Sequence, residues 1–159
     1  YSKTYGHYHP TADDGIAYPE LYQVLEGSAM FIMQSKNSDA SVNVITTVAE
    51  KGDVVLFPPG YGHVSINKGS DTLILANLVA DNFQSLYEDY ELYHGAAYYY
   101  TTNGLSQNDN YIIRSADGLS PAEINKKYDF ECKDLLTEFF VDPKKFEFLK
   151  RPSLLEKRS

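Results

Sequence analysis

The chain has 159 residues, of which 43% are hydrophobic and 14% aromatic, so it can fill the core of one domain and wholesale disorder is excluded. Fourteen lysines and arginines stand against 22 aspartates and glutamates, and the resulting net charge of −8 argues against nucleic acid and anionic membrane surfaces as partners. One cysteine excludes an intrachain disulfide, and no apolar run approaches the ~20 residues of a membrane span.

The first 115 or so residues favour short strands separated by turns. The candidates are apolar or alternating runs bounded by turn residues, and they lie over 24–34, 42–48, 53–57 and 71–80. Gly27 breaks the first of these runs and marks a bend or bulge. Tyr98–Tyr100 is a further strand candidate whose tyrosines alternate between core and surface, or else line a polar pocket. Spacing of roughly ten residues predicts a sandwich or small barrel.

The end of the chain changes character. Ser120, Pro121 and Glu123 form a typical helix start, with a capping residue, proline at the first helical position and glutamate at the third. Asp142-Pro143 offers a second start of the same kind. We therefore expect short helices between 121 and 150, packed on a β core, and a loose polar tail over 151–159.

The histidines carry the chemistry. His7 and His9 are two residues apart, so on a strand their imidazoles lie side by side on one face. Such a pair could chelate a metal, or it could be an exposed or internally satisfied pair. A third histidine and a carboxylate would complete a site of three nitrogens and one oxygen, suited to Fe, Mn, Ni, Co or Zn.

The surrounding residues resemble the two motifs of the cupin family, G(X)5HXH(X)3–4E(X)6G and G(X)5PXG(X)2H(X)3N. The second motif matches at every defined position, namely Gly52, Pro58, Gly60, His63 and Asn67. The first matches at His7, His9, Glu20 and Gly27. It departs in spacing, because ten residues separate His9 from Glu20 and only Gly6 precedes the pair. The resemblance implies an all-β, jelly-roll-like cupin barrel with a short α-helical C-terminal extension.

The flanking residues resemble the cupin-type (archaeal-type) glucose-6-phosphate isomerases more narrowly. The similar stretches are Thr4–Pro10, Tyr18–Gly27, Pro58–His63 and Asp142–Leu149, within a resemblance that covers most of residues 4–150. The long loop between His9 and Glu20 is similar to that of bacterial members. The resemblance implies a metal-dependent isomerase that interconverts glucose 6-phosphate and fructose 6-phosphate in glycolysis and gluconeogenesis.

The resemblance also implies roles for individual residues. His7, His9, Glu20 and His63 would bind one divalent transition metal (Fe²⁺, Mn²⁺, Zn²⁺ or Ni²⁺), and Glu20 would be the catalytic base. Thr4 and Gly6 match positions that help to hold the substrate phosphate, and Tyr22 matches a tyrosine near the sugar. A sugar phosphate is then the small-molecule partner, with neither nucleic acid nor membrane as a second one.

For the organisation of the chain, we expect a cupin barrel over 1–117, which lacks the N-terminal strands of a longer parent protein, and a helical extension over 118–159. The resemblance implies a homodimer, and the single cysteine with no signal peptide favours the cytoplasm. Two other functions stay open. One is a cupin dioxygenase with the same three histidines and glutamate, and the other is a non-catalytic sugar-binding cupin.

Overall fold

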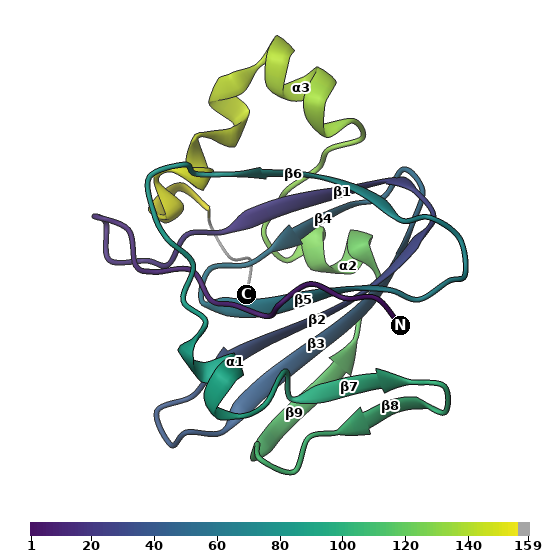
Figure 1. Ribbon diagram of the computed structural model, residues 1–159. Coiled ribbons are helices and arrows are strands. Elements are labelled where there is room, and N and C mark those ends of the chain that lie inside the picture. Colours follow the sequence, from purple (N-terminus) through teal and green to yellow (C-terminus); the bar gives the residue numbers. More distant parts are fainter. Residues whose placement is uncertain (156–159) are drawn as a thin grey trace.

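A computed structural model describes residues 1–155, and its main feature is two β-sheets that face each other (Figure 1). The first sheet has the order β4 (Val54–Phe57), β1 (Glu20–Glu26), β6 (Ile74–Val79). The second has the order β5 (Tyr61–Asn67), β2 (Ser28–Lys36), β3 (Val42–Glu50), β9 (Ile113–Gly118). The expected all-β, cupin-like fold with a short helical C-terminus is confirmed.

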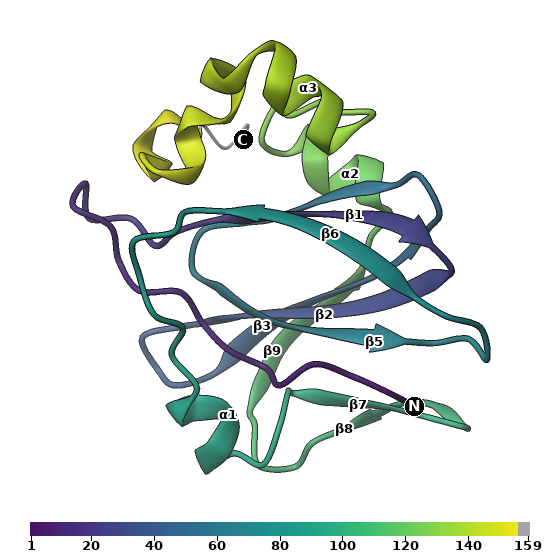
Figure 2. The same cartoon turned by 45° about the horizontal axis from the view of Figure 1, so that its top comes forward.

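Smaller elements cover the outer faces of these sheets. Helix α1 (Glu88–Leu92) and the hairpin β7 (Tyr98–Thr101) and β8 (Gly104–Gln107) lie on one side (Figure 2). On the other side are α2 (Pro121–Lys126), α3 (Leu135–Val141) and the 3₁₀ helices η1 (Pro143–Leu149) and η2 (Pro152–Leu154). Within residues 1–155, every helix is too short or too polar to traverse a bilayer. Of the tail expected over 151–159, residues 156–159 lie outside the described part of the chain.

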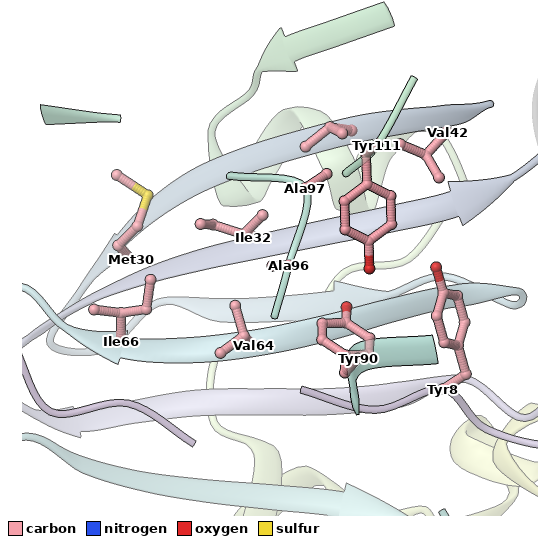
Figure 3. Packing of buried hydrophobic residues seen from close by; sticks show 11 residues of the cluster. Tyr8, Met30, Ile32, Val42, Val64, Ile66, Tyr90, Ala96, Ala97 and Tyr111 are labelled. Atoms are coloured by element: carbon pink, nitrogen blue, oxygen red, sulfur yellow. The ribbon is translucent and has the colours of Figure 1, made fainter. Parts of the chain in front are cut away.

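Strand β2 is buried on both faces, and its alternation therefore divides the interior into two cores. Phe31 and Met33 point between the sheets, where they meet Val55 and Phe57 of the first sheet. The outer face carries Met30 and Ile32, together with side chains from β3, β5 and the 90–111 region. Figure 3 shows tyrosines of this outer core, Tyr8, Tyr90 and Tyr111, beside β2 and β5.

The C-terminal helices bury the outer face of the first sheet. Leu21, Val54 and Leu56 pack against apolar side chains of the extension, which are Phe130, Leu135, Phe146, Phe148 and Leu149. Helix α2 begins with the predicted capping box, in which the Ser120 hydroxyl accepts from the Glu123 N–H and the Glu123 carboxylate accepts from the Ser120 N–H.

The second predicted helix start is only partly right. A helix does begin at Pro143, but it is a 3₁₀ helix and Asp142 makes no side-chain cap. Asp142 is the last capping position of α3, where its N–H donates to the Glu138 carbonyl. It is also the residue before η1, so the two helices follow each other without a turn. The capping carboxylate is instead Asp134, which accepts from the Thr137 N–H at 2.8 Å.

The N-terminal segment runs antiparallel along the edge of β5, through isolated bridges of Lys3 with Ile66 and His7 with His63. Gly6 lies between these bridges and faces the outer core. A Cβ at this position would lie 2.1 Å from two atoms of the Tyr90 ring, Cδ1 and Cε1. The absence of a side chain at Gly6 therefore lets the Tyr90 ring pack directly on the backbone.

Gly6→Ala should lower the free energy of unfolding by about 1–3 kcal/mol, because the Tyr90 ring must leave its packed position. Urea denaturation measures the change. Gly69→Ala is the matched control, since its added Cβ would have no neighbour closer than 3.8 Å. Equal stabilities of the two variants would contradict the steric role of Gly6.

Candidate metal centre

Four side chains from three separate segments converge between the two sheets. His7 and His9 come from the N-terminal segment, Glu20 begins β1, and His63 is the third residue of β5. One potential ligand atom from each of the four lies within 4.8 Å of the others. The backbones of His7 and His63 exchange two hydrogen bonds, at 3.0 and 3.3 Å, and this pairing brings the N-terminal histidines to the strand.

The spacing of the histidine pair gives the predicted geometry. His7 and His9 lie on one face, with their Nε2 atoms 3.3 Å apart. The Glu20 Oε2 atom lies 3.1 Å from His63 Nε2 and 3.4 Å from His9 Nε2. Three imidazole nitrogens and one carboxylate oxygen thus face a common point.

The contacts of the Nδ1 atoms of His7 and His9 show that the Nε2 atoms of both rings face the centre of the cluster. His9 Nδ1 donates to the Tyr18 carbonyl at 2.9 Å, and His7 Nδ1 is 3.3 Å from the Tyr5 carbonyl. A carbonyl oxygen only accepts, so the proton resides on Nδ1 and the Nε2 lone pair is left facing the cluster. Burial is the main reason that the pKa of His9 is lowered to about 4, and the nearby His63 lowers it further. The His9 ring is therefore neutral near neutral pH.

The cluster fits a divalent transition metal. Glu20 and His63 are only 3% and 2% exposed, yet Glu20 Oε2 and both ring nitrogens of His63 have no hydrogen-bond partner outside the cluster within residues 1–155. A buried polar atom without a partner costs about 1–3 kcal/mol, which a bound cation would offset. Neutral imidazoles with one carboxylate are the donors that such metals accept.

Glu20 is the charged member of the cluster. Burial alone would raise its pKa, but the neighbouring His63 and the amide of Asn77 outweigh burial and hold the pKa of the carboxyl below its usual value. Asn77 Nδ2 donates to Glu20 Oε1 at 2.7 Å. Sequence reasoning missed Asn77, although a polar residue within the apolar run 71–80 was an available signal.

The ten-residue loop before Glu20 supports His9. This loop supplies the carbonyl of Tyr18, and the Tyr18 ring stacks on Phe83 with ring centroids 4.7 Å apart. Phe83 in turn contacts the His9 ring at 4.6 Å. Phe83 was also missed by the sequence analysis, since nothing in its local pattern connects it with a residue 74 positions earlier.

The remaining predicted site residues lie at different places. Tyr22 shares the inward face with Glu20, and its ring centroid is 6.2 Å from that of His63. Burial and the Glu20 carboxylate raise the pKa of Tyr22, so its hydroxyl stays protonated. The Thr4 hydroxyl accepts from the Ser65 N–H at 3.0 Å, which holds the N-terminal segment on β5. Gly6 contacts Tyr90, and the phosphate-binding roles of Thr4 and Gly6 stay predictions.

Comparison with known proteins assigns the chain to a family. A family model described as Glucose-6-phosphate isomerase (GPI) matches residues 1–114, a span that holds all four members of the cluster. A comparison with curated proteins returns no match. The resemblance drawn from the motifs is confirmed. The chain belongs to the glucose-6-phosphate isomerase (GPI) family and is an isomerase that acts on glucose 6-phosphate.

Proposed function

We propose that the chain interconverts glucose 6-phosphate and fructose 6-phosphate with one divalent transition metal held by His7, His9, Glu20 and His63. The observation that carries this proposal is the set of four mutually facing ligand atoms. Glu20 and His63 are buried, and Glu20 Oε2 and the His63 ring nitrogens have no hydrogen-bond partner outside the cluster in the described chain. Fe²⁺, Mn²⁺, Zn²⁺ and Ni²⁺ all accept this donor set.

The reaction moves hydrogen between C1 and C2 of the sugar while the carbonyl and hydroxyl oxygens exchange character. A bound divalent cation would stabilise negative charge on these two oxygens. Glu20, kept ionised by His63 and Asn77, would take the C2 hydrogen of glucose 6-phosphate as a proton and deliver it to C1. The O2 hydroxyl proton ends on O1, so the atoms balance through a cis-enediol.

Other side chains would orient the sugar phosphate. Tyr22 is a protonated hydroxyl on the same face as Glu20, and it could donate a hydrogen bond to a sugar oxygen. We propose that Thr4 and the backbone at Gly6 contact the phosphate, on the ground of their match to the family motif. Remote phosphate binding would fix the sugar in the reactive register. A homodimer is proposed from the resemblance, and a cytoplasmic location from the single cysteine.

Treatment with a chelator should abolish isomerisation, and adding back Mn²⁺, Fe²⁺, Zn²⁺ or Ni²⁺ should restore it. The measurement is a coupled assay of fructose 6-phosphate conversion with the stripped protein. His63→Ala is the control that should stay inactive in every metal, because it removes a buried donor. Full activity after complete metal removal would overturn the proposed metal dependence, while the family assignment would stand.

A further inference from the structure

Strand β6 holds a residue that reaches the metal centre from outside the ligand set. In the antiparallel pairing of β1 and β6, Asn77 lies opposite Tyr22, and Val79 lies opposite Glu20. Side chains of directly paired residues share a face, so Asn77 points to the inward face of Tyr22 and Glu20. Its amide Nδ2 reaches diagonally to Glu20 Oε1 and donates a hydrogen bond of 2.7 Å.

We propose that Asn77 is a positioning residue that fixes which oxygen of Glu20 serves the metal. This inference rests on the proposed metal-dependent function. The two carboxylate oxygens are chemically equivalent until their surroundings distinguish them. Oε1 is occupied by the Asn77 amide, whereas Oε2 faces His63 and His9 and has no hydrogen-bond partner outside the cluster within residues 1–155.

A fixed orientation matters because the terminal torsion of glutamate is broad and costs little to rotate. The backbone alone places Glu20 at the start of β1, but it leaves the plane of the carboxylate free. A hydrogen bond to a charged oxygen is stronger than one between neutral groups, so Asn77 can hold that plane. Removing a hydrogen-bond partner of a metal ligand typically weakens metal binding by 10–100-fold.

The place of Asn77 makes the inference testable without damage to the core. Asn77 is an exposed residue of an edge strand, so its replacement opens no cavity. Asn77→Leu keeps the branching of the side chain at Cγ and lacks the donor. Asn77→Gln keeps an amide donor, one methylene further from the strand.

The experiment measures Zn²⁺ affinity by competition with a chromophoric chelator, on the full chain. Asn77→Leu should bind Zn²⁺ about 10–100-fold more weakly than the unchanged chain, and Asn77→Gln should recover part of the loss. All three metal-free proteins should stay folded, with a small fall in melting temperature for Asn77→Leu because Glu20 Oε1 loses its hydrogen-bond partner. Asn43→Leu, a matched change on β3, should leave Zn²⁺ affinity unchanged.

Two results would contradict the positioning role of Asn77, and only the second would also contradict the proposed function. If Asn77→Leu binds Zn²⁺ as tightly as the unchanged chain while His9→Ala binds it weakly, the positioning role is overturned and the metal centre stands. If the unchanged chain binds no Zn²⁺, Mn²⁺, Fe²⁺ or Ni²⁺, the proposed function fails and the role of Asn77 fails with it.

Discussion

Glu20→Gln should lower kcat for the isomerisation of fructose 6-phosphate by about 10²–10⁴-fold, which is the range for loss of a general base. Glutamine has the shape of glutamate and can still accept from Asn77 through its amide oxygen, but it cannot take a proton from carbon. Glu20 is only 3% exposed, so water cannot easily replace the lost base. Metal-saturated enzyme in the coupled assay gives the rate.

A control on the same strand separates this effect from a general change of charge. Glu26 ends β1 on the surface, where it pairs with Lys51 at 2.7 Å, and Glu26→Gln should leave kcat unchanged. Isomerisation in D₂O distinguishes the chemistry, because proton transfer through Glu20 admits solvent deuterium at the reacting carbon and a direct hydride shift does not. Full activity of Glu20→Gln without deuterium uptake would favour the hydride shift.

The grouping of the four side chains could be predicted from sequence, partly from short-range geometry and partly from the family resemblance. The period of two places His7 and His9 on one face, and the family motifs connect this pair with Glu20 and His63. Asn77 could not be found this way. Its contact with Glu20 depends on the register between β1 and β6, which the spacing of the two residues does not reveal.

Strand β5 shows why a functional strand is harder to recognise than a structural one. Val64 and Ile66 point to the outer core, while His63 and Ser65 point between the sheets. The inward face is therefore polar, because it carries part of the site. This segment is not among the strands predicted from the sequence, although its neighbours over 42–48 and 53–57 follow the usual apolar pattern.

Helix α1 and strand β9 were not predicted, the helix because it is short and the strand because its partner is distant in the sequence. Helix α1 has five residues, too few for a helical period to appear in the sequence, so only strands are predicted before residue 115. Strand β9 pairs parallel to β3, with Val42 opposite Ile113. A parallel pair needs a long connection, which here passes through β4, β5, β6, α1 and the β7–β8 hairpin.

The C-terminal extension is held on the barrel by one buried amide as well as by apolar contacts. Asn125 lies in α2, and its Oδ1 accepts from the Leu56 N–H at 2.9 Å while its Nδ2 donates to the Val54 carbonyl at 2.7 Å. Strand β4 is an edge of the first sheet, so these two backbone groups have no further strand to pair with. The Asn125 side chain takes the place of that strand.

Asn125→Leu should therefore lower the free energy of unfolding by about 2–6 kcal/mol, since two buried backbone groups each lose a partner at about 1–3 kcal/mol. Such a loss is a large part of the 5–15 kcal/mol that stabilises a typical domain. Urea denaturation of the metal-free chain measures it, with the exposed Asn103→Leu as the control. A loss below about 0.5 kcal/mol would contradict the role of the amide.

Because β4 ends at Phe57, whose ring lies 4.5 Å from that of His63, the same variant should also bind Zn²⁺ more weakly.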